Sequence, residues 1–373
     1  MRKNIGNKVL IFSGSDMRFG GGGQKNVINI SKKLGMPTKI YSVLCESTIR
    51  VPLSSLAGLE FEVIPSICFK SLNHWFPYGI LLLLNDKSTR DSYAMITFSS
   101  NIFVLFQLIL LSKFLGNILV LHVSDPLFFN QSRRDRISRV NGYMRSLLVR
   151  FLPRIHVATA GQESKLRNSG FKGKIYTFPF FFPNSKVNIP SVKDFVVLFA
   201  GRLEIVSKGI DLLGSVIEKV LLTEDKIIFR IAGSGQEGEV IIKSLVERFP
   251  DNVFWLGHLS ESDLQTEYER ASVFAFPSRY ENQPLSLLEA MNYGLLCVAF
   301  DIDGPRDLMI PGAGTLIPHY NTDIFSQTIL DYFNEWKASR TKFEEERYSR
   351  TEKMNQIYKV EETVNRIIDM IAP

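Results

Sequence analysis

Residues 272–294 read SVFAFPSRYENQPLSLLEAMNYG and contain the clearest structural pattern in the chain. The apolar run Val273–Phe276 predicts a buried strand, and the residues that follow it, through Gln283, predict a loop. Pro284 is expected at the first position of a helix, and Gly294 is expected to end that helix. The stretch therefore predicts a strand, loop and helix of the kind from which parallel α/β sheets are built.

Two carboxylates lie eight residues apart in this unit, Glu281 in the loop and Glu289 on the helix. The backbone N–H groups of Leu285 and Ser286, at the start of the helix, make a natural site for an anion. Glu281 would be repelled by that anion unless it faces neutral hydroxyl groups beside it. A nucleotide sugar supplies both groups, because its diphosphate fits the amides and its hydroxyls fit the two acids.

The run ENQPLSLLEAM resembles the E-x7-E signature of the retaining glycosyltransferases of family 4, which have the two-domain GT-B fold. Residues 196–213, VVLFAGRLEIVSKGIDLL, resemble the segment of that family in which an arginine and a lysine hold the donor diphosphate. Those two positions are Arg202 and Lys208 in this chain. Residues 297–318 are similar to the strand, Gly-Pro loop and closing turn that end the donor domain of the family.

The resemblance implies an α/β protein with two doubly wound Rossmann-like domains that face each other across a cleft. It implies transfer of a hexose or N-acetylhexosamine from a nucleoside diphosphate sugar to a hydroxyl of a glycan or lipid-linked acceptor. We expect UDP as the nucleotide, with GDP as the alternative. Arg202 and Lys208 would stabilise the leaving diphosphate together with the helix amides, Glu281 would orient the sugar, and Glu289 would bind the ribose. The phrase FDIDGPRDL further resembles members that assemble bacterial surface polysaccharides.

Further site residues are predicted at the ends of strands in the first half of the chain. Gly22 and Gly23 open the first helix, where glycine allows the backbone to approach a ligand closely. His122 ends a strand in the region where the family carries a histidine that contacts the donor sugar, and Asp125 is predicted as a sugar or acceptor contact. The alternatives are a flexible turn for the glycines and a structurally satisfied ring for the histidine.

Residues 233–238, GSGQEG, match the G-x-G-x-x-G fingerprint of dinucleotide-binding proteins. That fingerprint requires an acid at the end of the next strand, whereas Asp251 precedes the next strand. We therefore interpret the glycines as approaching the nucleotide of a sugar donor rather than a dinucleotide. The residues expected near that nucleotide are Gly233, Gly235, His258 and Leu259.

No metal site is predicted. Asp301 and Asp303 match the metal-binding D-x-D of the other major glycosyltransferase fold, but they follow the helix that would bind the donor in this architecture. We expect transfer that needs neither a metal ion nor another cofactor. The cysteines, Cys45, Cys68 and Cys297, show no metal-ligand spacing and are interpreted as reduced core residues of a cytoplasmic protein.

The chain of 373 residues is longer than one hydrophobic core usually organises. Residues 1–185 contain 24 Lys and Arg against 9 Asp and Glu, whereas residues 186–373 contain 20 against 29. Such an asymmetry indicates two units with different partners. The predicted domains are an acceptor-binding domain over 1–182, a nucleotide-sugar domain over 183–345, and a C-terminal helix over 346–373 that, by the resemblance, crosses back to the first domain.

Basic residues concentrate in residues 132–154, where Arg133, Arg134 and Arg136 belong to a predicted helix with one apolar stripe. Two interpretations stay open, a solvated helix face and a face held against anionic lipid or a pyrophosphate-linked acceptor. Arg133 and Arg134 are the predicted acceptor-side contacts. Nucleic acid is disfavoured as a partner because no aromatic-stacking pattern accompanies the charge.

The sequence shows no secretory signal, and its apolar stretch Ile102–Leu111 is shorter than the roughly 20 residues that span a bilayer. This stretch predicts a buried helix. The expected location is the cytoplasm, with attachment to the inner face of the membrane as an extension of the lipid interpretation.

Three other function classes remain as alternatives. A nucleotide-sugar epimerase of the same architecture would need further acid and base carboxylates, and an NAD-dependent oxidoreductase would have to use GSGQEG. A catalytically silent binding subunit is disfavoured because Arg202, Lys208, Glu281 and Glu289 are all present.

Overall fold

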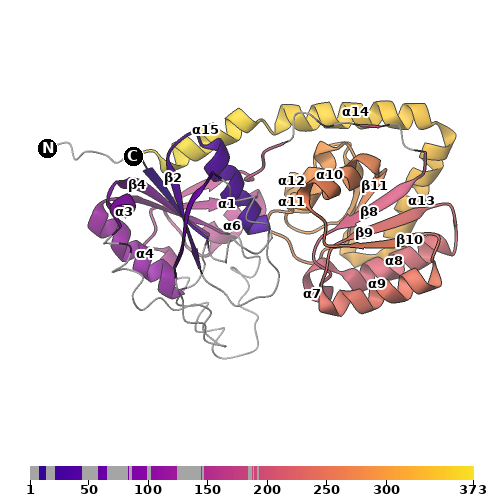
Figure 1. Cartoon of the computed structure of the whole chain (residues 1–373), viewed down its shortest axis with the longest axis horizontal. Helices are drawn as coiled ribbons and strands as arrows, with labels where there is room; N and C mark the ends of the chain where they lie inside the picture. Colours follow the sequence, from indigo (N-terminus) through magenta and orange to yellow (C-terminus); the bar gives the residue numbers. More distant parts are fainter. Residues whose placement is uncertain are drawn as a thin grey trace. The chain divides into compact units, whose positions relative to one another are not determined.

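The computed structural model describes residues 8–13, 22–43, 58–64, 83, 86–98, 102–123, 144, 147–183, 187, 189–190 and 193–373. The chain divides into two compact units (Figure 1). Unit 1 comprises Met1–Phe182 and Val360–Pro373, and unit 2 comprises Pro183–Lys359. Among the described residues, none of the helices is long and apolar enough to cross a bilayer.

Unit 1 is built on a seven-stranded sheet with the order β3-β2-β1-β4-β5-β6-β7, and every neighbouring pair runs parallel. The strands are β1 Lys8–Phe12, β2 Thr38–Val43, β3 Glu60–Ile64, β4 Ser92–Thr97, β5 Ile118–His122, β6 Arg154–Val157 and β7 Lys174–Thr177. The helices are α1 Gly22–Lys33, α3 Lys87–Arg90, α4 Ile102–Leu115, α6 Ala160–Asn168 and α15 Val360–Ile371.

Both faces of this sheet are buried, as alternation along β1 shows. Leu10 and Phe12 enter the hydrophobic cluster that contains the buried residues of α4. Val9 and Ile11 enter the cluster on the other face, which contains buried residues of α1 and α15. Successive side chains of a strand point to opposite faces, so helices are required on both sides of the sheet.

The C-terminal tail is divided between the two units. Residues 360–373 belong to unit 1, whereas residues 346–359 belong to unit 2, where residues 346–357 form the end of α14 Arg340–Ile357. In unit 1, Arg154 donates to the carbonyls of Met370 and Ala372 at 2.8 and 2.5 Å, which fixes the last turn of α15 to β6.

Unit 2 contains a six-stranded parallel sheet with the order β10-β9-β8-β11-β12-β13. The strands are β8 Val196–Ala200, β9 Ile228–Ala232, β10 Val253–Gly257, β11 Val273–Phe276, β12 Leu296–Phe300 and β13 Gly314–Ile317. The helices are α7 Ile205–Lys208, α8 Ile210–Leu221, α9 Gln236–Arg248, α10 Glu261–Arg270, α11 Leu285–Asn292, α12 Pro305–Leu308, α13 Thr322–Ala338 and α14, with a 3-10 turn at Pro318–Tyr320.

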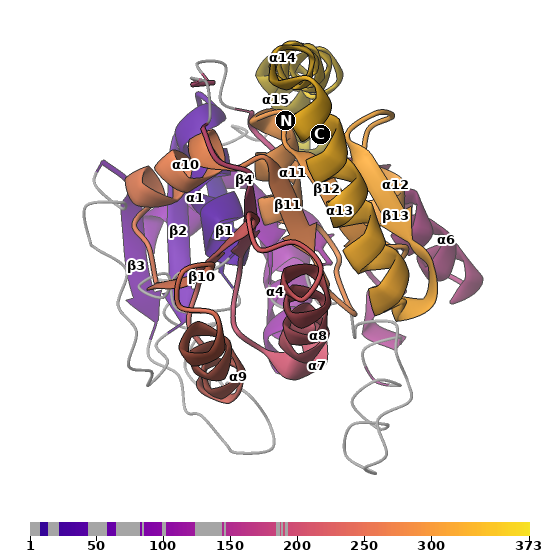
Figure 2. The same ribbon diagram turned by 90° about the vertical axis from the view of Figure 1, so that its right-hand side faces the viewer.

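Helices cover the unit 2 sheet on both faces. In Figure 1, α8 and α9 lie on one side of the sheet and α10 and α11 on the other, and Figure 2 shows the same separation. The side of α8 holds the main core of the unit, which includes Leu213 and Ile217 of α8 together with Phe325 and Ile329 of α13. This is the doubly wound arrangement that the alternation of strands and helices predicts.

Two local predictions differ from the structure. Residues 314–317, expected in a closing turn, form the edge strand β13, paired in register with β12. The apolar stretch predicted as a buried helix forms most of α4, whose Leu105 and Leu108 are buried, but Phe106 and Leu110 are 49% and 46% exposed. A run that is apolar on every side does not show which face of the helix meets the core.

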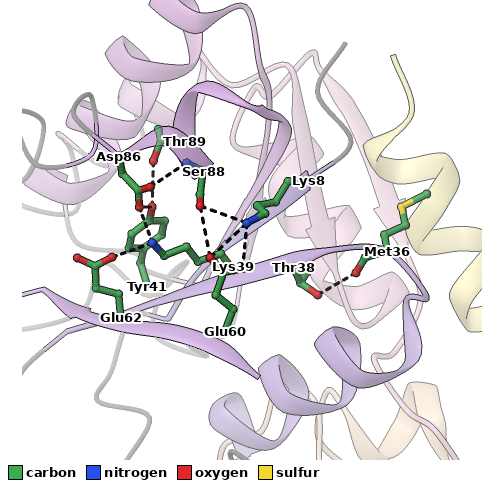
Figure 3. Close-up of polar contacts among 10 residues, drawn as sticks. All are labelled: Lys8, Met36, Thr38, Lys39, Tyr41, Glu60, Glu62, Asp86, Ser88 and Thr89. Atoms are coloured by element: carbon green, nitrogen blue, oxygen red, sulfur yellow. Dashed lines mark hydrogen bonds and ion pairs between the residues drawn. The ribbon is translucent and has the colours of Figure 1, made fainter. Parts of the chain in front are cut away.

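A charged network ties β1, β2 and β3 to α3 on one side of unit 1 (Figure 3). Asp86, the N-cap of α3, accepts hydrogen bonds from Lys39, from the hydroxyl of Tyr41 and from the backbone N–H of Ser88. Lys39 also pairs with Glu62 at 2.9 Å. Burial by itself raises the pKa of Asp86, but the bonds from Lys39 and Tyr41 bring it down to about 2.

We predict that Asp86→Asn lowers the free energy of unfolding by about 1–3 kcal/mol at neutral pH, because it removes the charge that three donors share. The folded pKa of Asp86 lies below its ordinary value of 3.8, so this stabilisation is present above pH 3.8 and is lost as the pH falls toward 2. Urea unfolding of wild type and variant across this pH range measures the difference. The matched control is Glu62→Gln, whose side chain is 52% exposed and should matter by less than about 1 kcal/mol. A loss for Asp86→Asn that does not change with pH would contradict the assignment.

Candidate functional site

The order of strands in unit 2 shows where the winding of the sheet reverses. From β8 the chain moves outward to β9 and β10, whereas from β11 it moves the opposite way to β12 and β13. In doubly wound sheets ligands bind at the carboxyl ends of the two central strands, where the direction of winding reverses. The loops that leave those ends here are residues 201–204 after β8 and residues 277–284 after β11.

A close backbone contact joins these two connections. Gly209 ends α7 and begins α8, with φ at +67°. A Cβ at this position would lie 2.1 Å from the carbonyl oxygen of Pro277. Only glycine tolerates both the left-handed backbone and this approach, and the contact brings the neighbouring Lys208 to the loop that follows β11.

Lys208 and Glu281 form an ion pair at this junction. Their side chains are only 18% and 9% exposed. Ser278 donates a second hydrogen bond to the same Oε1 of Glu281, at 3.0 Å. The structure therefore brings together two of the predicted site residues that are 73 positions apart in the sequence.

A second ion pair, which the sequence analysis did not identify, locks the same junction. Arg279 donates two hydrogen bonds of 2.7 Å to the carboxylate of Asp211 in the first turn of α8. It also donates to the carbonyl of Ile205 at 2.6 Å. The bond from Arg279 lowers the pKa of Asp211. Neither residue stands out locally, because the pairing depends on the return of the chain after 68 residues.

Arg202 lies in the loop after β8, as predicted, but it is more open than Lys208. Its guanidinium pairs with Glu204, and its side chain is 66% exposed. Glu204 also accepts a hydrogen bond from the hydroxyl of Ser207. Arg202 is thus a cation on the solvent side of the loop that can move toward an anion at low cost, because exposed pairs are worth little.

The start of α11 carries the two predicted amide donors, the backbone N–H groups of Leu285 and Ser286. Pro284 is the N-cap rather than the first helical residue, because its ψ of 83° is not helical. No side chain caps this end of the helix. The amides of Leu285 and Ser286 are therefore directed along the helix axis without a capping side chain, at the end that carries partial positive charge.

Glu289 is held on α11 one turn beyond these amides. Its carboxylate accepts a hydrogen bond of 3.1 Å from the hydroxyl of Tyr268. Tyr268 is buried, and burial followed by the nearby charge of Glu289 raises its pKa well above the ordinary value. The tyrosine therefore stays protonated and serves as a fixed donor that orients the carboxylate.

Two buried arginines of α14 hold α11 from its far end. Arg347 donates to the carbonyls of Tyr293, Tyr268 and Glu269 at 2.9, 2.9 and 3.0 Å, and Arg350 donates to Gly294 at 2.8 Å. These carbonyls end α10 and α11, where cations are favoured by the helix dipole. Burial lowers the pKa of Arg347 to about 10, so it remains charged at neutral pH.

The GSGQEG glycines have an internal role in the structure. Added Cβ atoms would lie 1.8 Å from the Gly201 carbonyl at Gly233, and 2.6 Å from the Leu203 carbonyl at Gly235. A Cβ added at Gly238 would likewise lie 2.4 Å from the Leu203 carbonyl oxygen. Close packing against the loop after β8 thus accounts for all three glycines without a dinucleotide. This packing supports the position of Arg202 between Gly201 and Leu203.

The predicted His258 and Leu259 lie after β10 at the same carboxyl edge of the sheet. Because β10 is the edge strand, they are separated from β8 by β9. Gly22 begins α1 in unit 1, with Gly23 as its second residue. The predicted Asp125, Arg133 and Arg134 lie outside the described residues, as do Cys45 and Cys68.

His122 does not occupy the open position that was expected. Its side chain is 2% exposed, and its Nδ1 lies 2.7 Å from Nδ1 of His156, its neighbour on β6. The rings of Phe98 and Phe180 pack against it at centroid distances of 4.7 and 4.9 Å. Burial lowers the pKa of His122 to about 3, so the ring is neutral at physiological pH.

Asp301 and Asp303 are engaged by a cation of their own segment. Arg306 donates to the Asp301 carboxylate at 2.7 Å and lies 3.5 Å from the Asp303 carboxylate. Within the part of the chain that the structure describes, no group of three or more His, Cys, Asp or Glu side chains could hold a metal ion. Cys297 is buried in β12 as a free thiol, and burial raises its pKa.

The chain is similar in sequence and in fold to known glycosyl transferases. Residues 182–350 match the family model of glycosyl transferases group 1. A glycogen synthase of Kosmotoga olearia is 32% identical over 146 residues, which cover 37% of this chain and 30% of that protein. A poly(glycerol-phosphate) alpha-glucosyltransferase of Bacillus subtilis is 32% identical over 126 residues, which cover 33% of this chain and 18% of that protein. The matches thus span less than a third of either relative.

The solved structure of HepE from Anabaena, in complex with UDP and glucose, superposes with a TM-score of 0.77 at 17% sequence identity. The superposition covers 98% of this chain and 99% of HepE. The chain therefore has the GT-B fold, and its second unit is related in sequence to group 1 glycosyl transferases.

We predict that Gly209→Ala destabilises the protein by about 3 kcal/mol or more, because its Cβ would collide with the Pro277 carbonyl. Gly312→Ala is the matched control, since Gly312 has φ +84° but nothing within 4 Å of an added Cβ. The control should show only the left-handed backbone penalty of about 1–2 kcal/mol. Urea unfolding of both variants gives the comparison, and equal losses would mean that the Gly209 contact is not a structural requirement.

Proposed function

We propose that the protein is a retaining glycosyltransferase. It would transfer a hexose or N-acetylhexosamine from a nucleoside diphosphate sugar to a hydroxyl of a glycan or lipid-linked acceptor. UDP is the proposed nucleotide, and assembly of a bacterial surface polysaccharide is the proposed setting. The observation that carries the proposal is the ion pair between Lys208 and Glu281. Lys208 ends α7, which follows β8, and Glu281 lies in the loop between β11 and the uncapped start of α11. The winding of the unit 2 sheet reverses between β8 and β11.

The proposed diphosphate site uses positive charge from three sources. Lys208 and Arg202 supply two cations, and the amides of Leu285 and Ser286 supply the partial charge of a helix N-terminus. All four groups follow the carboxyl ends of β8 and β11. Donors that are already fixed in place stabilise the charge that develops on a leaving diphosphate without reorganisation.

The two carboxylates would bind hydroxyl groups of the donor. Glu281, buried beside Lys208, is proposed to orient the transferring sugar, and Glu289 to accept hydrogen bonds from the ribose. In the absence of donor, Lys208 neutralises Glu281. When a diphosphate binds Lys208, the sugar hydroxyls would replace the ammonium group as donors to Glu281. The carboxylate then avoids being left buried without a partner.

We propose that the reaction proceeds with retention, by attack from the face that the diphosphate leaves. The bond between the anomeric carbon and the diphosphate oxygen breaks, and a bond to the acceptor oxygen forms on the same face. The proton of the acceptor hydroxyl passes to an oxygen of the leaving diphosphate. Neither His122 nor a covalent nucleophile takes part in this scheme.

Transfer is proposed to need no metal ion or other cofactor. The charge of the diphosphate would be offset by Arg202, Lys208 and the helix amides. Asp301 and Asp303, the acids that could have suggested a metal, already face the guanidinium of Arg306.

The direct test is release of the nucleoside diphosphate from a panel of UDP- and GDP-linked sugars, with the product analysed by NMR. Lys208→Ala and Arg202→Ala should each lower turnover on the accepted donor by roughly a hundredfold or more, since losing one fixed donor to a developing oxyanion raises the barrier by about 2.7–4 kcal/mol. The matched control is Lys219→Ala, which removes a lysine of α8 from its ion pair with Asp323 and should leave turnover unchanged.

Near-wild-type turnover of both site variants would remove these residues from the phosphate site. Conversion of the donor to its epimer without transfer would instead favour an epimerase, and a product of inverted configuration would refute retention.

We also predict that EDTA leaves transfer largely intact, because protein cations and helix amides would offset the charge of the diphosphate. Initial rates measured with and without the chelator test this. Loss of activity that manganese restores would show that a metal ion is required and that Asp301 and Asp303 had been wrongly excluded.

A further inference from the structure

Unit 1 presents apolar side chains to solvent on two neighbouring segments, α4 and residues 147–151. On α4, Phe106, Leu110 and Phe114 are 49%, 46% and 75% exposed. Their spacing of four residues places them on one side of the helix. Leu147 and Phe151 of the second segment are 39% and 56% exposed. We call these five residues the apolar face.

The two segments are joined by the core and by a surface contact. Leu108 and Ile109 of α4 are buried in the same hydrophobic cluster as Val149 and Leu152. At the surface, the ammonium group of Lys113 lies 5.6 Å from the centroid of the Phe151 ring. The exposed residues of the two segments therefore form one surface. The helix α4 lies on one face of the unit 1 sheet (Figure 1).

Exposed apolar side chains in unit 2 are scattered rather than grouped. Its most exposed aliphatic residues, Val206, Leu222 and Val240, lie on separate elements, α7, the end of α8 and α9. Single exposed apolar residues need no explanation, whereas a group of them marks an interaction surface. The grouping on unit 1 is thus the feature to be explained.

The charges beside the apolar face indicate what covers it. Lys113 and Arg150 are exposed and lie within or next to the two segments. Residues 1–185 carry 24 Lys and Arg against 9 Asp and Glu. In a symmetric dimer formed through this face, Lys113 and Arg150 would lie close to the same two cations of the second copy, because both copies use the same surface in an isologous interface. An anionic surface would complement them.

We propose that the apolar face is a membrane-binding surface that takes anionic lipid. Phenylalanine and leucine side chains would enter the boundary between headgroups and acyl chains, with the helix lying in the plane of the membrane. Lys113 and Arg150 would face the phosphate groups of the lipids, where each cation contributes about 1 kcal/mol. Binding to vesicles is measured without a sugar donor. A failed membrane assay would therefore count against this surface alone, and a failed transferase assay would count against the proposed function alone.

The experiment is co-sedimentation of the full chain with vesicles of phosphatidylcholine alone and with vesicles that also contain phosphatidylglycerol. Wild-type protein should bind the anionic vesicles, and binding should weaken as salt rises from about 0.1 M to about 1 M. The double variant Phe106→Ser, Phe114→Ser should bind roughly tenfold more weakly or worse, since it removes two aromatic side chains from the inserted face. The control is Leu222→Ser, Val240→Ser, which changes two exposed apolar residues of unit 2.

Charge reversal provides a second, independent variant. Lys113→Glu, Arg150→Glu should abolish the preference for phosphatidylglycerol, whereas Lys226→Glu, Lys359→Glu, two exposed lysines of unit 2, should keep it. All changes are at exposed positions, and an unchanged melting temperature verifies that each variant is folded.

Two results would overturn the proposal. The first is binding that the apolar-face variants leave intact, or that is equal for neutral and anionic vesicles. The second is a wild-type dimer in sedimentation equilibrium that Phe106→Ser, Phe114→Ser converts to a monomer, without lipid binding by either protein. That result would assign the face to a second copy of the chain.

Discussion

The contact between Gly209 and the Pro277 carbonyl sets the geometry of the candidate site. The absence of a Cβ at Gly209 lets the start of α8 lie directly against the loop after β11, at the point where the winding of the unit 2 sheet reverses. The Arg279–Asp211 pair then fixes the same two segments through side chains. Lys208 and Glu281 are brought together by this junction, because neither is near the other in the sequence.

The site depends on rigid support as well as on its own residues. Arg347 and Arg350 bind the carbonyl ends of α10 and α11, so the helix that carries Glu289 is held at its far end while its first amides stay uncapped. Burying an arginine is costly unless its N–H groups find acceptors, and Arg347 donates to backbone carbonyls whereas Arg350 also lies 3.9 Å from the carboxylate of Glu346. Both arginines support α11 from the end opposite its uncapped amides.

The sequence was most informative where the signal is local. The bounds of β11 were predicted correctly, because this strand is a short buried run that ends at turn residues. Lys208 was predicted from the family resemblance and Glu281 from the strand, loop and helix pattern; the structure pairs the two side chains, and their roles stay predictions. Two features were missed, because they depend on distant packing: the Arg279–Asp211 pair and the exposed side of α4. A structurally satisfied ring was only the alternative for His122, because the sequence does not show that His156 lies beside it. The close packing of the GSGQEG glycines against the backbone of residues 201–203 also depends on segments that are distant in the sequence.

The central claim is that the junction of β8, α7 and α11 binds a diphosphate. Isothermal titration of UDP and GDP, each compared with its nucleoside, measures the contribution of the phosphates directly. At least one nucleoside diphosphate should bind with one site per chain, and its nucleoside should bind about a hundredfold more weakly, since charge-assisted hydrogen bonds to phosphate are lost. Equal binding of nucleoside and diphosphate, or binding of neither diphosphate, would contradict it.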